Sequence, residues 1–161
     1  MQQFSTWRVA LVMGIGVTIL LALPACAGAE EGDGRITPDR GAGRFTPCPA
    51  SPNCVSTQAP ADDAQHYMEP IPMGDDAATA KTRILTIINR MPRTTVTQND
   101  ADYLRVEFRS RVFRFVDDVE FYFDEAAARI DFRSASRLGY SDMGVNRKRM
   151  AEITELYTTG N

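Results

Sequence analysis

The sequence predicts an α+β fold: a two-layer sandwich of about four antiparallel strands, with a helix before and a helix after them. Three observations support this prediction. Apolar residues recur at helical spacing in two segments, and they alternate with polar residues in the segments between. The chain has 161 residues, the usual size of a single domain. Its hydrophobic residues, 43% of the total, suffice for one core.

The first predicted helix comprises residues 75–91, DDAATAKTRILTIINRM. It begins with acidic residues and carries Arg90 near its end, which is the arrangement that the helix dipole favours. Pro92 then ends the helix. The apolar residues that share one helix face are Ile84, Leu85, Ile87, Ile88 and Met91.

Four strands are predicted to follow. Residues 94–97, TTVT, are all β-branched, and residues 103–110, YLRVEFRS, alternate apolar and charged side chains as a half-buried strand does. Residues 112–124, VFRFVDDVEFYFD, and 128–134, ARIDFRS, repeat the alternation. The side chains expected on the core face of the last two strands are Phe113, Phe115, Val119, Phe121, Phe123, Ile130 and Phe132.

The opposite face of the sheet would carry mixed charges and tyrosines, which is typical of a solvated face and sometimes of a protein-binding one. Its expected residues are Tyr103, Arg105, Glu107, Arg109, Arg114, Tyr122 and Arg129.

Asp117 interrupts the alternation, because its position places a carboxylate on the core face. Either the strand bulges at residues 116–118 or Asp117 is buried and paired, since an unpaired buried carboxylate is strongly destabilising. Arg133 and Arg137 are the expected partners of Asp117 and its neighbour Asp118.

The last predicted helix comprises residues 144–157, with Met150, Ile153 and Tyr157 spaced for burial. The stretch that leads into it, residues 133–149, RSASRLGYSDMGVNRKR, holds five basic residues and one acid in a chain of net charge −3. We refer to residues 133–149 as the basic elbow.

The basic elbow is the candidate site. Ser141 or Asp142 would cap the last helix, and Arg133, Arg137 and Arg147 could converge beside its N-terminus, where a phosphate, sulfate or carboxylate would bind. The alternative is that these arginines only form internal ion pairs with the acidic strand. The predicted members of this anion-binding or structural polar network are Asp117, Asp118, Arg133, Ser136, Arg137, Ser141, Asp142, Asn146 and Arg147.

Residues 1–27 are predicted to direct export rather than to join the fold. An apolar run, residues 9–25, follows Arg8 and ends in small residues, as in a secretory signal. Alternatives are a retained membrane anchor and a lipoprotein signal in which Cys26 is lipidated. Each would place the protein in the periplasm or cell envelope, and a retained anchor or a lipidated Cys26 would also hold it close to a membrane. Residues 28–46, rich in glycine and charge, would be a flexible tether.

Residues 47–161 then form a single globular domain, with its α+β core at residues 75–157. The first part, residues 47–74, holds six of the nine prolines and has no periodicity, which predicts an irregular N-terminal wrap. Cys48 and Cys54 are an even pair in an exported protein, and such a pair indicates a disulfide.

The sequence gives little support for catalysis. Met143 stands where a G-x-S-x-G nucleophile motif around Ser141 would require glycine. Asp62, Asp63 and His66 form a local trio without a second cluster, which is more typical of a solvated loop than of a metal site. No catalytic residue, metal or cofactor is therefore predicted. A net charge of −3 argues against nucleic-acid binding.

Three stretches carry a resemblance to a known family: FTPCPASPNCVSTQA, FRFVDDVEFYFD and RSASRLGYSDMGVNRKR, in this order. Over residues 44–157 the chain resembles the uncharacterised family catalogued as domain of unknown function 1499. The resemblance implies mostly bacterial relatives, often in or near membranes, and it implies no activity, catalytic residue or cofactor.

Together these observations predict an exported envelope protein, a small module that binds an anion or head group or that assists assembly. Its partner would be an envelope protein or a small anionic ligand. One alternative is a purely structural or protein-partner module in which the basic elbow is an internal ion-pair network. The other is an enzyme of unknown type.

Overall fold

We describe a computed structural model of the protein, and the description covers residues 43–160. The predicted export segment, with Cys26, and nearly all of the predicted tether lie outside these residues. Among the described helices, none is long and apolar enough to cross a bilayer.

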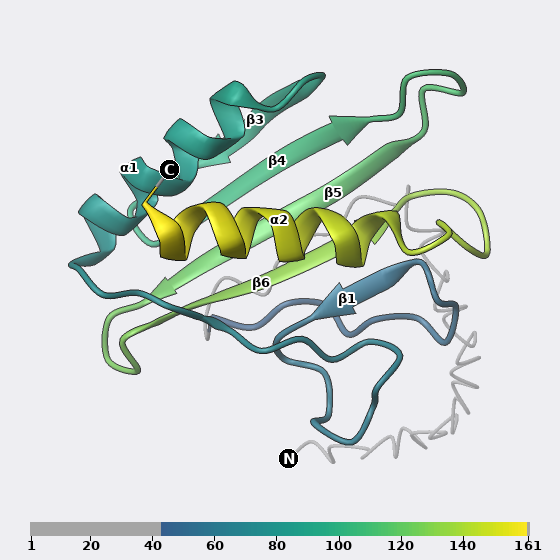
Figure 1. Cartoon of the computed structure of the whole chain (residues 1–161). Coiled ribbons are helices and arrows are strands. Elements are labelled where there is room, and N and C mark those ends of the chain that lie inside the picture. Colours follow the sequence, from purple (N-terminus) through teal and green to yellow (C-terminus); the bar gives the residue numbers. More distant parts are fainter. Residues whose placement is uncertain (1–42, 161) are drawn as a thin grey trace, which may run out of the picture. The chain divides into compact units, whose positions relative to one another are not determined.

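The domain is an α+β fold in which two helices cover one face of an antiparallel sheet (Figure 1). The strand order is β1-β6-β5-β4-β3, and β2 also pairs with β6. The elements in chain order are β1 Cys54–Ser56, β2 Ile71–Pro72, α1 Ala77–Arg90, β3 Thr94–Asn99, β4 Tyr103–Arg109, β5 Val116–Asp124, β6 Arg129–Ser136 and α2 Val145–Thr159.

The predicted class, both helices and the strands β3 to β6 are confirmed, but the predicted number of strands is wrong. The sheet has six strands rather than four, because the proline-rich segment contributes β1 and β2 to the edge of β6. Pro72 is tolerated there, since an edge residue need not donate a ladder hydrogen bond. The wrap is therefore partly strand.

The core lies between the helices and the sheet. Ile84 and Ile88 of α1 meet Phe121 of β5 and Phe132 of β6, and all four side chains are fully buried. Met150, Ile153 and Tyr157 of α2 are buried in the same cluster, as predicted. Asp76 caps α1 by accepting a hydrogen bond from the Thr79 backbone N–H.

Two aromatic residues that were predicted to face the core do not. Phe113 is 75% exposed and Phe115 is 49% exposed, because β5 begins only at Val116. The preceding residues form a hairpin loop, in which the Ser110 N–H donates to the Phe115 carbonyl and the Phe115 N–H donates to Ser110 Oγ. Arg114 lies in this loop, with φ 54°, and not on the sheet face.

Cys48 and Cys54 form a disulfide, as predicted, and Cys54 is fully buried. We expect the double substitution Cys48→Ser/Cys54→Ser to lower the free energy of unfolding by about 2 kcal/mol, because the cross-link restricts a short loop of the unfolded chain. Denaturant unfolding of the oxidised parent and the double variant measures the difference. A double variant as stable as the oxidised parent would contradict this prediction.

Candidate functional site

The predicted polar network, which joins the basic elbow to Asp117 and Asp118, is divided between the two faces of the sheet. Asp117 and Asp118 are consecutive residues of β5, whose pairing with β6 is regular along its length, so β5 does not bulge at residues 116–118. Consecutive strand residues point to opposite faces. Asp117 therefore faces the helices and Asp118 faces the outer side, and each has its own partners.

On the helix face, Asp117 is buried and paired, but not with Arg133 or Arg137 as predicted. Arg149 of α2 donates to Asp117 Oδ2 at 2.6 Å, and Ser136 Oγ donates to Oδ1 at 2.6 Å. The Arg149 guanidinium also lies 4.5 Å above the centre of the Phe108 ring. Arg149 was not among the residues predicted for the polar network. Its position directly before the predicted core residue Met150 is the feature of the sequence that places it near the sheet.

Asn146 ties the start of α2 to the sheet and the wrap. This buried side chain accepts hydrogen bonds from Ser134 Oγ and from Arg149, at 2.5 Å and 2.7 Å. Its amide nitrogen donates to the Asn53 carbonyl and to Ser136 Oγ, both at 3.0 Å. All its hydrogen-bonding capacity is thus spent inside the domain.

On the outer face, Arg137 pairs with Asp118, as predicted, at 2.7 Å, and also with Glu107 at 2.6 Å. Arg105 donates to the same fully buried Asp118 carboxylate at 2.9 Å. Burial acts to raise the pKa of Asp118, but the hydrogen bonds and charges of Arg137 and Arg105 outweigh it, so the pKa lies below its usual value. The two arginines thus favour the ionised form of Asp118.

Arg133 pairs with Glu120, at 3.3 Å, and not with either aspartate. Both side chains are almost completely buried, and the Tyr103 hydroxyl donates to the other Glu120 oxygen at 2.6 Å. Burial raises the pKa of Glu120, although Tyr103 and Arg133 act to lower it. The outer face was predicted to be solvated, and between β4 and β6 it is instead a buried polar network.

The predicted convergence of Arg133, Arg137 and Arg147 on one spot is wrong. Arg147 donates to the backbone carbonyls of residues 64, 65 and 67 in the wrap. Gly144 is the N-cap residue of α2, and the Asp142 carboxylate, two residues earlier, satisfies free N–H groups at this end as predicted, because it accepts from the backbone N–H groups of residues 144 and 146. Ser141 is exposed and only accepts a hydrogen bond from the Met143 N–H. The guanidinium groups of the basic elbow are therefore engaged in internal contacts.

The local trio of Asp62, Asp63 and His66 does not form a metal site. His66 is buried, with Nδ1 2.6 Å from Asp63 Oδ2 and Nε2 facing the Ser51 carbonyl. The hydrogen bond from His66 lowers the pKa of Asp63. Over residues 43–160 no group of three potential metal ligands comes together.

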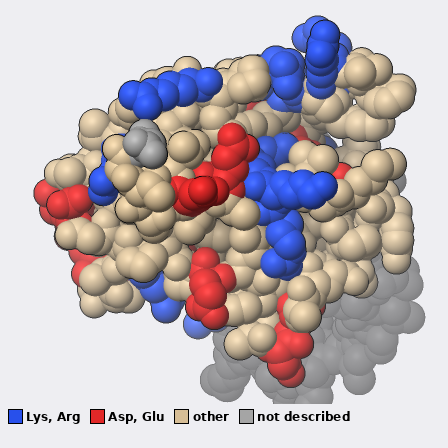
Figure 2. All heavy atoms as spheres, in the orientation of Figure 1, with Lys and Arg blue, Asp and Glu red and all other residues tan. Residues whose placement is uncertain are grey.

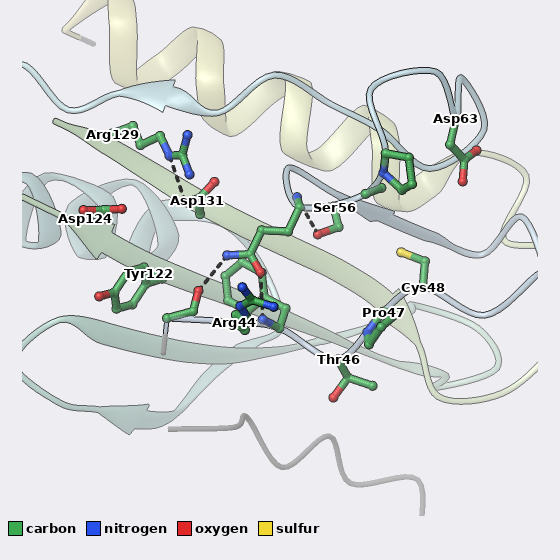
Figure 3. Close-up of a pocket in the computed structure, with 15 residues that line it drawn as sticks. Arg44, Thr46, Pro47, Cys48, Ser56, Asp63, Tyr122, Asp124, Arg129 and Asp131 are labelled. Carbon is green, nitrogen blue, oxygen red and sulfur yellow. Dashed lines mark hydrogen bonds and ion pairs between the residues drawn. The ribbon is translucent and has the colours of Figure 1, made fainter. Parts of the chain in front are cut away.

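A cavity of about 940 Å³ lies between the outer face and the wrap, lined by Tyr122 and Asp124 of β5 and by Arg129 and Asp131 of β6 (Figure 3). Its polar groups largely satisfy one another: Arg129 donates to Asp131 at 3.0 Å. The Gln58 amide binds the backbone of residues 43 and 45. These contacts hold the wrap against the sheet and engage Arg129, Asp131 and Gln58 within the domain.

A second cavity, of about 640 Å³, lies between the end of α1 and the first turns of α2, with Phe108 and Asp117 among its lining residues. We refer to it as the basic groove. Asp117 and Glu152 are its acids, and Asp117 is neutralised by Arg149. The basic residues that line it are Arg90, Arg93, Arg109, Lys148 and Arg149.

Two cations of the basic groove, Arg90 and Lys148, are exposed and form no ion pair with any described residue. Arg93 donates only to the Arg109 carbonyl, and Arg109 pairs with Glu107. The basic groove thus keeps unpaired positive charge, and one of its two unpaired cations, Lys148, comes from the basic elbow. Figure 2 shows the face of the domain that carries the helices, where basic side chains (blue) lie next to acidic ones (red).

Comparison with known proteins agrees with the resemblance found in the sequence. No curated protein and no solved structure matches the chain. The model of one family, described as a protein of unknown function (DUF1499), matches residues 44–156, which includes the disulfide, the whole sheet and nearly all of α2. The chain belongs to the DUF1499 family.

Proposed function

We propose that this protein is an exported module of the cell envelope that binds an anionic head group in the basic groove. One observation carries the proposal: the groove has five basic side chains and two acidic ones, in a chain of net charge −3. A phosphate, sulfate or carboxylate is the chemical complement of such a surplus. The ligand is a small anion or the anionic part of a larger molecule.

The basic groove suits this role better than the predicted site at Arg133, Arg137 and Arg147. Arg133 and Arg137 already compensate buried carboxylates, so an anion would have to displace them at a large cost. Arg90 and Lys148 have no such commitment among the described residues. Their charges are available to an incoming ligand.

Export is supported by the sequence alone, through the apolar run at residues 9–25. The Cys48–Cys54 disulfide is compatible with it, because disulfides persist in oxidising compartments such as the periplasm. A tethered domain with one cationic groove would then work at or near the membrane surface.

Binding of pyrophosphate, a soluble anion, tests the proposal. At about 20 mM salt, where screening is weak, we expect titration calorimetry to detect binding to the parent. Arg90→Gln/Lys148→Gln should weaken it about tenfold, because two charge-assisted contacts are lost.

The matched control is Arg44→Gln/Arg83→Gln, which removes the same charge from exposed positions outside the basic groove. Arg83 forms a surface ion pair with Asp75, at 3.7 Å, and its guanidinium lies 4.9 Å from the centre of the Tyr157 ring, so its loss costs about 1–2 kcal/mol of stability and leaves the domain folded. This control should bind pyrophosphate nearly as the parent does. Equal weakening in both double variants, or no binding by the parent, would refute the basic groove as an anion site.

A further inference from the structure

Exposed apolar side chains gather at one end of the domain. Two segments lie there: residues 110–115, the loop between β4 and β5, and residues 137–145, the loop after β6 together with Val145, the first residue of α2 (Figure 1). Among the described residues, these loops hold every large apolar side chain that is exposed, apart from Val96. The exposed side chains are Val112, Phe113, Phe115, Leu138, Tyr140, Met143 and Val145. We refer to these two loops as the apolar end.

The loops are neighbours because of the strand order. The end of β4, the start of β5 and the end of β6 lie side by side, as the pairing of Phe108 with Asp117 and of Asp117 with Ser136 shows. The Arg137 N–H donates to the Val116 carbonyl at 3.0 Å and joins the start of the second loop to the first residue of β5, directly after the first loop. The apolar side chains of both loops therefore lie at the same end of the sheet.

Hydrogen bonds fix the conformation of both loops. Their apolar side chains are therefore exposed on ordered loops. Ser110 and Phe115 close the first loop with two hydrogen bonds, and Asp142 organises the second. Arg114 and Met143 have left-handed backbone conformations, with φ 54° and 56°. Such conformations cost energy in residues other than glycine and are concentrated at functional sites.

Basic residues are interleaved with the apolar ones. Arg111 and Arg114 are exposed within the first loop, which has no acid. Asp142 is the only acid of the second loop, and its carboxylate is occupied by backbone N–H groups. Long arginine side chains can place their charge beside lipid phosphates while neighbouring apolar groups enter the acyl boundary.

We propose that the apolar end docks on the surface of an anionic lipid bilayer. The phenylalanines and Leu138 would enter the boundary between head groups and acyl chains, and Arg111 and Arg114 would contact lipid phosphates. This inference rests on the proposed function, because the basic groove opens beside the same loops: Ser110 and Val145 line it. The anionic head group of the basic groove is then that of a lipid.

Charge distinguishes a bilayer from other occupants. A second copy of the chain, docked end to end, would bring Arg111 and Arg114 of each protomer against those of the other, and like charges oppose that contact. The apolar side chains stand on two projecting loops rather than in a concave groove, which is the shape for insertion into a soft surface. The predicted apolar run at residues 9–25 would also keep the domain near a membrane.

Tryptophan fluorescence of the full chain in vesicles tests the proposal. Trp7 is the only tryptophan, so Trp7→Phe/Phe113→Trp carries one reporter at the apolar end. We expect brominated acyl chains to quench this reporter about twofold more strongly in vesicles with phosphatidylglycerol than in phosphatidylcholine alone. Adding Arg111→Gln/Arg114→Gln should reduce quenching in the anionic vesicles to the neutral level.

The matched control is Trp7→Phe/Val96→Trp, since Val96 is the exposed apolar residue that lies elsewhere, on β3. Its reporter should be quenched weakly in both vesicles, because the apolar run near the N-terminus anchors both variants equally. Equal quenching of the Phe113→Trp and Val96→Trp reporters would overturn the proposal. Equal quenching of the Phe113→Trp reporter in neutral and anionic vesicles would also overturn it.

Pyrophosphate separates this inference from the proposed function. Adding Phe115→Ser/Leu138→Ser to the Phe113→Trp reporter variant should leave pyrophosphate binding as in the parent, because neither residue lines the basic groove, but should weaken quenching of the reporter in anionic vesicles. Pyrophosphate binding without quenching of the Phe113→Trp reporter would refute docking alone. Quenching without pyrophosphate binding would refute the basic groove as a site and leave docking supported.

Discussion

Arg133→Met is expected to lower the free energy of unfolding by about 3–5 kcal/mol at pH 7. The substitution removes the cation that pairs with Glu120, whose side chain is fully buried on the outer face. The Tyr103 hydroxyl would remain as a hydrogen-bond donor, but it carries no charge. An uncompensated buried carboxylate must then either stay ionised at a large cost or take up a proton.

The loss should depend on pH in a defined direction. Burial raises the pKa of Glu120 above its ordinary 4.5 in the parent, and loss of Arg133 would raise this pKa further. A carboxyl whose pKa is raised on folding favours the folded state most when it is protonated, and this contribution is lost as pH rises through the folded-state pKa. The deficit of Arg133→Met relative to the parent should therefore be smallest below about pH 4 and grow towards neutral pH.

Denaturant unfolding at several pH values, with Glu120→Gln/Arg133→Met as the matched control, checks this prediction. The double variant should regain most of the stability, because it buries a neutral amide instead of a charge. Arg133 Nε has no hydrogen-bond partner, so the native pair is itself incompletely compensated. A deficit of Arg133→Met that is the same at every pH would show that lost packing, not the charge of Glu120, is the cause.

Arg149→Met is expected to cost about 3 kcal/mol, somewhat less than Arg133→Met. It leaves Asp117 without its cation on the helix face, and it also removes the stacking on Phe108 and a donor to Asn146. The cost is lower because Asp117 keeps the hydrogen bond from Ser136 and its side chain is 10% exposed to solvent.

Two further variants separate charge from geometry in thermal or denaturant unfolding. Arg149→Lys keeps the charge but cannot reach Asp117, Asn146 and the Phe108 ring together, so it should lose about 1–2 kcal/mol. Asp117→Asn/Arg149→Met should recover much of the stability. If this double variant is no more stable than Arg149→Met, Asp117 is not the group that Arg149 stabilises.

The periodicity of the sequence predicted each long element, but it misplaced the start of β5. Phe113 and Phe115 continue the alternation of Phe121 and Phe123, and alternation alone cannot show where a strand ends. In the structure the hairpin closes between Ser110 and Phe115, and both aromatics become exposed. The same residues that were assigned to the core thus belong to the proposed docking surface.

The ion pairs show a second limit of prediction from the sequence. The place of Asp117 in the alternation predicted that either the strand bulges at residues 116–118 or Asp117 is buried and paired with a cation. The sequence could not select that cation among several arginines of the basic elbow, because the selection depends on how α2 is rotated over the sheet. Arg133 pairs with Glu120 because the register between β5 and β6 places these two residues opposite each other.

The sequence by itself determined the α+β class, the two helices, four of the six strands, the pair of cysteines and the membership of a family. These follow from local patterns or from motif order. Only the tertiary structure decided which charges are neutralised, that the wrap adds β1 and β2 to the sheet, and that two distant loops share one end. Each of these depends on strand register and helix packing, which bring together residues that no local period relates.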